Sequence, residues 1–257
     1  MKRVAGALAA LVVAWIVFLL IAGPIYGGRA RERIRDRVGG SLNAQTTIDD
    51  DSLALVRGFL ELRGVHAKRE DVGTFSIDAE LVRCELLPFG GALWNHTCRD
   101  LKIEGVRMEV TSVGFIQFHK PKKDPLYVDH VVIRDGEISF APSAFVPDLG
   151  RIEIKVTEAD AGPTTFTTPL AWIFELHELK ATLALPAGVT VALAYANGVL
   201  TATGRLFGSA PISVPLVLPK STGNVEKDLE ALGTVAKQVA QDLVEQRAQD
   251  WLRSKLP

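Results

Sequence analysis

The spacing of hydrophobic residues divides the chain into three parts. Residues 4–26 form an uncharged, mostly apolar run of 23 residues, and a helix needs about 20 such residues to cross a bilayer. Between residues 43 and 220, apolar and polar residues mostly alternate, which is typical of strands with one buried face. From about Asn224, apolar residues recur at spacings of three and four, which predicts an amphipathic helix. The pattern therefore predicts a membrane anchor (1–26), a β domain (43–220) and a C-terminal helix (221–257).

The segment between the anchor and the β domain, residues 27–42, is strongly basic. Ala30, Ile34, Val38 and Leu42 recur every four residues, so a short amphipathic helix at the membrane surface is expected. Long arginine side chains can reach lipid headgroups from such a helix, although a plain stop-transfer flank has the same charges. The candidate headgroup contacts are Arg29, Arg31, Arg33, Arg35 and Arg37.

Charge alone does not decide which side of the membrane holds the β domain. Lys2 and Arg3 precede the apolar run, whereas five arginines follow it. The positive-inside rule would put the C-terminal side in the cytoplasm, but long domains can translocate despite flanking charge. The run is also longer than the apolar core of a cleaved signal peptide, and Pro24 interrupts the cleavage region, so a retained anchor is expected.

The β domain is predicted to be an antiparallel sheet. Asn197-Gly198 is a strong signal for a two-residue hairpin, because a type I′ turn requires positive φ at both central positions. Asp135-Gly136 predicts a second hairpin between two apolar strands. No helix-length crossover separates the predicted strands, and hairpin connections favour antiparallel pairing. The expected fold class is therefore mainly β (α+β), with one helix at each end of the chain.

The composition gives no sign of catalysis. The net charge is −1, from 29 basic and 30 acidic residues, so the overall charge does not predict a nucleic-acid partner. The sequence lacks a nucleophile elbow, a phosphate loop, a dinucleotide fingerprint and an HExxH motif, and its five histidines are scattered. We therefore expect no enzyme activity, cofactor or metal site.

Cys84 and Cys98 fit either a disulfide in an oxidising compartment or two separate buried thiols.

The first 145 residues resemble the AsmA-like family, envelope proteins related to bridge-like lipid transporters. The resemblance lies in the order of an uncleaved span, the stretch "RARERIRDRVGGSLNAQTTIDDDSLAL", the strand "GFLELRGVHAK" and the strand ending "VVIRDGEISF". It implies an anchor in the bacterial inner membrane, a body in the periplasm, and a long sheet curled into a groove with an apolar inner face. It transfers no catalytic residue.

Two functions are compatible with this pattern. The first is binding or transfer of phospholipid along the groove in outer-membrane biogenesis; ten to twelve strands, about 4.8 Å apart, give a groove of roughly 50 Å, too short to span an envelope alone. The second is a scaffold that fills the groove with its own side chains and recruits another envelope protein by a sheet edge or the C-terminal helix. Burial of the inner-face residues distinguishes the two. The candidate groove residues are Ile152, Ile154, Val156, Val191, Leu193 and Leu216.

Overall fold

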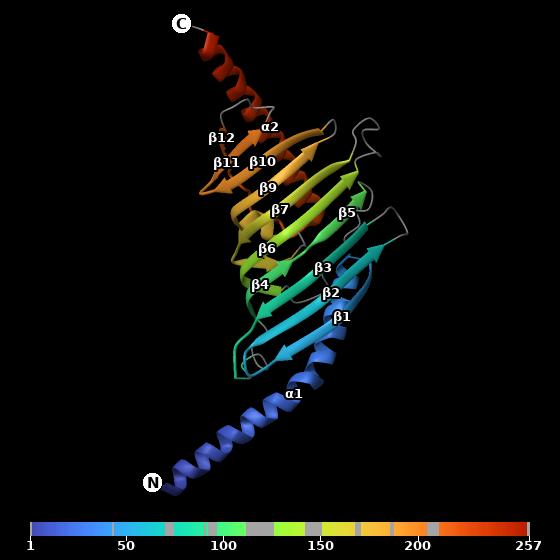
Figure 1. Ribbon diagram of the computed structural model, residues 1–257, viewed down its shortest axis with the longest axis vertical. Helices are drawn as coiled ribbons and strands as arrows, with labels where there is room; N and C mark the ends of the chain where they lie inside the picture. The colour runs from blue at the N-terminus through green and yellow to red at the C-terminus, as the bar shows by residue number, and fades with distance from the viewer. Residues whose placement is uncertain are drawn as a thin grey trace.

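The protein is mainly β, with one long helix at each end of the chain (Figure 1). The computed structural model describes residues 2–42, 44–69, 75–89, 91, 97–111, 126–141, 151–167, 171–185, 188–204 and 211–255. Helix α1 (Lys2–Leu42) precedes the sheet, and helix α2 (Val225–Lys255) follows it. The predicted fold class is confirmed.

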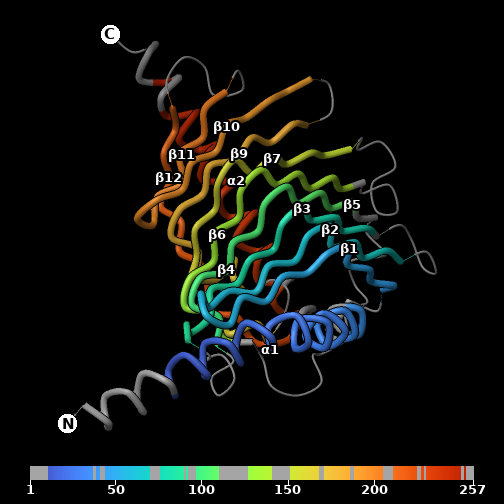
Figure 2. The backbone as a smooth tube through the Cα atoms, turned by 60° about the horizontal axis from the view of Figure 1, so that its bottom comes forward, coloured from blue at the N-terminus to red at the C-terminus, as the bar shows by residue number. Residues whose placement is uncertain are grey.

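Twelve strands of the described chain form one curved sheet (Figure 2). Their order is β1-β2-β3-β4-β6-β7-β9-β10-β11-β12, while β5 pairs with β3 and β6, and β8 pairs with β6. A short 3-10 helix, Ala171–Glu175, precedes β9. The strands are β1 (Gln45–Ala54), β2 (Phe59–Arg69), β3 (Phe75–Glu85), β4 (Cys98–Glu104), β5 (Arg107–Thr111), β6 (Leu126–Ala141), β7 (Ile152–Ala161), β8 (Thr164–Phe166), β9 (Leu176–Leu185), β10 (Val189–Ala196), β11 (Val199–Gly204) and β12 (Ile212–Pro215).

One junction of the sheet is parallel, which differs from the predicted antiparallel arrangement. β4 and β5 run parallel to β6, with Leu101 opposite Val131 and Met108 opposite Ile138. A parallel pair needs a long crossover connection. Here the connection between β5 and β6 is residues 112–125, which lie outside the described residues. Its first part continues the apolar alternation of β5 in the sequence, so the pattern gave no sign of a crossover.

The Asp135-Gly136 pair lies inside one long strand, so the prediction of a hairpin there is wrong. β6 is continuous over 16 residues, and Asp135 has a φ of 52°. Positive φ in an Asp-Gly pair occurs both in type I′ turns and in irregularities within strands, and the sequence cannot distinguish these cases. The predicted hairpin at Asn197-Gly198 is confirmed, because the pair joins β10 to β11 with φ values of 51° and 75°.

Apolar side chains share one face of the sheet across its full width. We call this the inner face; α1 and α2 both pack on it, and Figure 1 shows both helices passing behind the sheet. Nine spacings of about 4.8 Å make the row of ten adjacent strands about 43 Å wide. The row of directly paired residues from β1 to β12 is Asp51, Leu62, Val82, Ile103, Ile133, Ala159, Leu179, Tyr195, Leu200 and Val214.

Helix α1 is continuous for 41 residues, from the apolar run into the basic segment. No break occurs at residue 26 or at Gly39-Gly40. Residues 11–36 have a mean hydropathy of 2.2 over their most apolar window, 22% of which is buried, so this stretch is a candidate membrane-spanning helix. The anchor and the basic segment are therefore one continuous helix with a bend (Figure 2), about 60 Å along its path at about 1.5 Å per residue.

The later part of α1 packs on β1 and β2. Leu19, only 1% exposed, lies in a cluster with Leu55, and Ile34 packs against a second cluster that contains Ile48. Gly23 permits this close approach, since a Cβ at this position would be 2.6 Å from the Leu53 carbonyl oxygen. Ile34 of the basic segment thus faces protein, and the segment continues α1 instead of forming the separate helix that the sequence predicted.

Helix α2 begins at a hydrogen-bonded turn and crosses the inner face toward β12. The Asp228 carboxylate, 0% exposed, accepts hydrogen bonds from the Ser221 hydroxyl and from the Thr222 amide and hydroxyl, each 2.7 Å long. Further along, Val239 and Leu243 join the hydrophobic cluster of the inner face. The helix is roughly 46 Å long at about 1.5 Å per residue, and its last turns extend beyond the sheet (Figure 1).

Candidate functional site

The candidate groove residues form part of one continuous apolar surface on the inner face. Val156 and Val191 are buried, at 8% and 3% exposure. The other four are half-buried. All six except Ile152 belong to or pack against the cluster that contains Leu243 of α2. The structure therefore brings five of the six residues together, and of all six, two are covered and four are partly open.

The inner face extends further than the sequence indicated. Half-buried Val82, Ile103 and Ile133 continue the same surface into β3, β4 and β6. Each occupies an apolar position in a strand with alternating apolar and polar residues, so the sequence of each strand does indicate its apolar face. Their alignment with β7 and β10 depends on strand register, which the sequence pattern does not contain.

The opposite face, which we call the outer face, carries ion pairs that run across strands. His130 on β6 lies between Asp100 on β4 and Asp160 on β7, with its ring nitrogens 2.7 Å from a carboxylate oxygen of each. The hydrogen bond to Asp160, followed by that to Asp100, raises the pKa of His130 above its ordinary value. Because both ring nitrogens face carboxylates, this site favours the imidazolium form.

Other ion pairs on the outer face also join neighbouring strands. Glu158 on β7 lies 3.3 Å from Arg134 and 3.2 Å from Lys180, and the hydrogen bonds to Lys180 and then Arg134 lower its pKa. His66 on β2 lies 2.6 Å from Asp78, and this hydrogen bond raises its pKa. The outer face is thus a solvated, charged surface, in contrast to the apolar inner face.

The five candidate headgroup arginines are spread along the axis of α1. Arg31 pairs with Asp51 of β1 at 3.2 Å, so it fixes the helix to the sheet. The Arg29 guanidinium lies 6.0 Å from the ring centroid of Tyr26.

Arg35 pairs with Asp36 at 3.1 Å, and Arg33 is exposed. The side chain of Arg37 lies outside the described residues. At about 1.5 Å per residue, the backbone of Arg37 is roughly 16 Å beyond Tyr26 along the helix.

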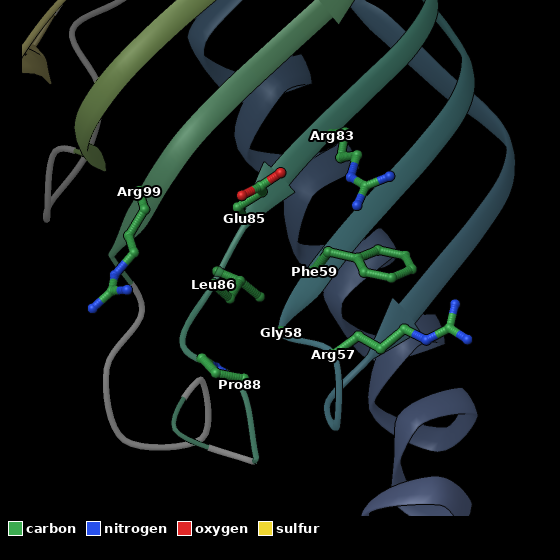
Figure 3. A pocket seen from close by; sticks show the side chains of 8 residues that line it. All are labelled: Arg57, Gly58, Phe59, Arg83, Glu85, Leu86, Pro88 and Arg99. Carbon is green, nitrogen blue, oxygen red and sulfur yellow. The ribbon is translucent and has the colours of Figure 1, made fainter.

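A different arginine cluster lies where the sheet meets the apolar part of α1. We call this the anchor-side end; it consists of the β1–β2 turn (55–58), the residues after β3 (86–89) and the beginning of β4. A depression of about 390 Å³ opens there (Figure 3). Its lining residues are Arg57, Gly58, Phe59, Arg83, Glu85, Leu86, Pro88 and Arg99.

The three arginines of this depression come from three different segments, so sequence spacing did not group them. The Arg83 guanidinium lies 4.5 Å from the ring centroid of Phe59 and 3.8 Å from Glu61. Arg57 and Arg99 are exposed, and neither forms an ion pair with a described residue. Glu85 is paired with Lys102 at 3.3 Å. The depression therefore has an excess of positive charge.

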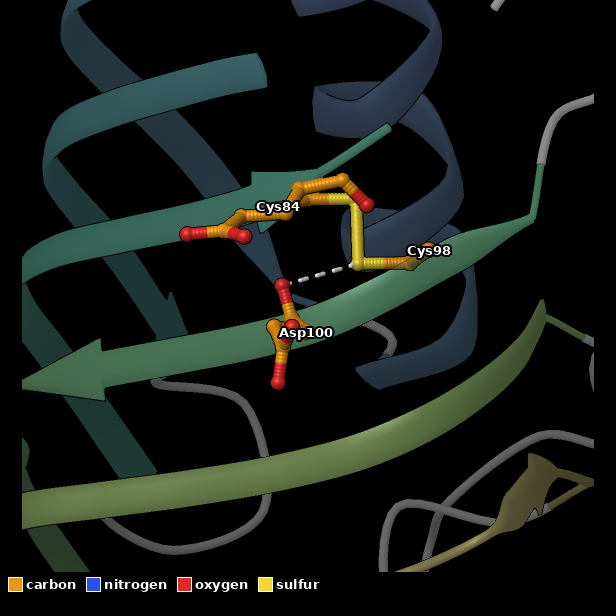
Figure 4. Close-up of a disulfide and its surroundings, with 4 residues drawn as sticks. Cys84, Cys98 and Asp100 are labelled. Atoms are coloured by element: carbon orange, nitrogen blue, oxygen red, sulfur yellow. Dashed lines mark hydrogen bonds between the residues drawn. A yellow bond between two sulfur atoms is a disulfide. The ribbon is translucent and has the colours of Figure 1, made fainter. Parts of the chain in front are cut away.

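A disulfide joins the strands beside this depression. Cys84, near the end of β3, bonds to Cys98, the first residue of β4, with their Cα atoms 5.6 Å apart (Figure 4). Of the two alternatives from the sequence, the structure contains the paired cysteines. Cys98 is 0% exposed, and its Sγ lies 3.5 Å from the Asp100 carbonyl oxygen. The bond closes the loop that contains Pro88 and Phe89 at the anchor-side end.

The described residues contain no group of three or more His, Cys, Asp or Glu side chains arranged to hold a metal ion. No family model and no curated protein matches the chain. Two features of the described residues bear on function: the apolar inner face and the basic anchor-side end.

Proposed function

We propose that the protein is a membrane-anchored periplasmic protein of the AsmA-like type that binds or helps to transfer phospholipid in cell-envelope biogenesis. The observation that carries this proposal is the unbroken row of paired apolar residues from Leu62 on β2 to Val214 on β12. Acyl chains need a continuous apolar surface, because each Å² of apolar area removed from water contributes about 25 cal/mol. This apolar row crosses nine strands, so it is about 38 Å wide and accommodates the chains of one or two phospholipids.

The incomplete burial of this surface also supports lipid binding. In the middle of the sheet, Ile133 on β6 and Ile154 on β7 remain half-buried, so an acyl chain would remove further apolar area from water. A scaffold with a filled core would bury such side chains almost completely. The ion pairs keep the middle of the outer face in water, so acyl chains bound by the sheet would lie on its inner face.

The proposed location rests on two features. The apolar stretch of α1 has the length and composition of a membrane span. The Cys84–Cys98 disulfide favours an oxidising compartment such as the periplasm. An anchor in the inner membrane with its C-terminal side in the periplasm satisfies both, and it requires translocation of the sheet despite the arginines that follow the span.

Uptake of a fluorescent phospholipid by the full chain in nanodiscs tests the proposed function. Leu193→Gln places a polar group on the inner face, whereas Ala192→Gln alters the exposed neighbour on the same strand. We expect uptake to fall several-fold in Leu193→Gln and to stay at the wild-type level in Ala192→Gln. Equal uptake by both variants, with an unchanged circular dichroism spectrum, would contradict the proposal.

A second candidate function is recruitment of an envelope protein. Edge strand β12 has only four residues, and Val217, just after it, is 84% exposed. On α2, Val244 is 68% exposed and Leu252 is 51% exposed. An added strand or helix would cover these side chains. A pull-down from envelope extract that depends on Val217 but not on Leu193 would favour this function.

A further inference from the structure

The anchor-side end of the sheet lies at the level of the proposed membrane span. The Trp15 indole nitrogen donates a hydrogen bond of 3.2 Å to the Phe89 carbonyl, and Leu19 packs against Leu55. Both helix residues belong to the uncharged run that ends at Tyr26. At about 1.5 Å per residue, Leu19 lies roughly 10 Å inside that end. A helix that crosses the bilayer along this run therefore brings the adjacent turns of the sheet to the bilayer surface or below it.

The side chains at this end suit a membrane interface. Phe89 has a positive φ of 53° and its side chain is 63% exposed beside Trp15. An exposed ring held by its backbone next to an apolar helix is costly in water, whereas an interface accepts aromatic and aliphatic side chains. The disulfide fixes the base of this loop between β3 and β4. Phe89 is therefore held beside the span by the Trp15 hydrogen bond and the disulfide together.

The charges near Phe89 suit phosphate groups. Arg57, Arg83 and Arg99 line the depression that Figure 3 shows, with their guanidinium groups on different sides of it. Of the carboxylates beside it, Glu85 pairs with Lys102, and Glu61 pairs with Arg63 at 2.8 Å and with Arg83 at 3.8 Å. The guanidinium groups of Arg57 and Arg99 thus keep their donors for an anion. Guanidinium binds phosphate oxygens through paired hydrogen bonds, and each basic residue near an anionic membrane surface contributes about 1 kcal/mol.

We propose that the anchor-side end is a second membrane contact, in which Phe89 enters the bilayer and Arg57, Arg83 and Arg99 bind the phosphates of anionic phospholipid headgroups. The contact holds the sheet at a fixed angle to the membrane that contains α1. It rests on the membrane anchoring within the proposed function, but not on lipid binding by the inner face. It also differs from the predicted role of the α1 arginines, because its charges come from the sheet.

Native mass spectrometry of the full chain released from nanodiscs tests this contact. The nanodiscs contain phosphatidylcholine mixed with phosphatidylglycerol, and the measured quantity is the enrichment of phosphatidylglycerol on the protein. We expect Arg57→Gln with Arg99→Gln to lower this enrichment by about tenfold or more. The matched control, Arg107→Gln with Arg134→Gln, removes two exposed arginines elsewhere on the outer face and should retain the enrichment.

Two further measurements distinguish the membrane contact from a free-anion site and from lipid binding on the inner face. Inorganic phosphate in excess should lower the enrichment no more than sodium chloride of the same ionic strength does, because the contact requires lipid. A larger loss in phosphate would overturn the membrane contact in favour of a free-anion site. Equal enrichment in the Arg57/Arg99 variant and wild type would overturn it as well. Fluorescent phospholipid uptake, measured on the same samples, reports on the inner face separately. Loss of enrichment with normal uptake would support the contact, and loss of uptake in Leu193→Gln alone would leave it intact.

Discussion

The two helices meet the same sheet in different ways. Along α1, Gly23 brings the helix backbone against the Leu53 carbonyl, and Leu19 is only 1% exposed. Along α2, a Cβ at Gly233 would meet no atom within 4 Å, and Val244 is 68% exposed. The comparison indicates that α1 is an integral part of the sheet, whereas α2 is held mainly at its beginning and near Leu243. Displacement of α2 is therefore the simpler way to uncover the inner face.

The largest expected effect concerns the end where α1 meets the sheet. Replacement of both cysteines, Cys84→Ser with Cys98→Ser, should lower the free energy of unfolding by about 3 kcal/mol, because the disulfide closes a loop of about 15 residues. Urea unfolding of the full chain in detergent measures this change. Reduction of the wild-type protein should give the same shift of the midpoint. A wild type whose unfolding is insensitive to reductant would show that the bond does not stabilise this end.

The attachment of α2 can be broken at its first turn. Asp228→Ala removes three hydrogen bonds and leaves the Thr222 amide without an acceptor, so we expect a loss of about 2 kcal/mol. Hydrogen exchange should rise along α2 and stay unchanged along α1. Asp242→Ala, which removes an exposed hydrogen bond from Gln238 on the same helix, is the matched control. Equal exchange in both variants would contradict the idea that the Asp228 turn holds α2.

Glycine substitutions compare the two helix contacts directly. Gly23→Ala should cost about 1 kcal/mol or more, because its methyl group would lie 2.6 Å from a backbone oxygen that cannot easily move. Gly28→Ala and Gly233→Ala should be neutral or stabilising by up to about 1 kcal/mol, since both positions are open. Thermal unfolding of the three variants measures the difference. The same shift at all three positions would mean that α1 and α2 pack equally loosely.

The smallest effect concerns the charged outer face. The carboxylates of Asp160 and Asp100 raise the pKa of His130, so the stabilisation that they provide is fully present below the ordinary histidine pKa. It is lost as the pH rises through the higher folded-state pKa. Because the site is partly exposed, we expect at most about 1 kcal/mol.

The difference in unfolding free energy between wild type and His130→Gln should therefore shrink from pH 6 toward alkaline pH. Urea unfolding of both proteins, at a series of pH values on either side of the ordinary histidine pKa of about 6.5, measures this difference. A difference that does not depend on pH would contradict the stabilisation of protonated His130 by Asp100 and Asp160.

Local periodicity predicted much of this fold. The alternation in β7 and the Asn197-Gly198 turn specify local geometry, and both were predicted from the sequence. Pairing between distant segments was not predictable in this way. The parallel junction of β4 with β6, and the continuity of β6 through Asp135, depend on register. The stripe that includes Ile34 was assigned to the membrane surface because lipid and protein surfaces select the same apolar spacing.

The candidate sites show the same limit. The sequence identified inner-face residues such as Ile154, because a strand pattern marks its own apolar side. It did not identify the cluster of Arg57, Arg83 and Arg99, whose members are brought together by three neighbouring segments of the sheet. It also left open whether Cys84 pairs with Cys98, since a bond requires the Cα separation that only strand pairing supplies.

Photo-crosslinking in the membrane tests directly whether phospholipid lies on the inner face. A photo-crosslinking phenylalanine derivative is placed at half-buried Ile154, and, in a matched chain, at exposed Lys155 one residue further along β7. The full chain is irradiated in its membrane, and phospholipid adducts are measured by mass spectrometry. If phospholipid lies on the inner face, an adduct forms at position 154 and none forms at position 155. No adduct at position 154 in a folded, membrane-inserted chain, or equal adducts at both positions, would contradict phospholipid binding on the inner face.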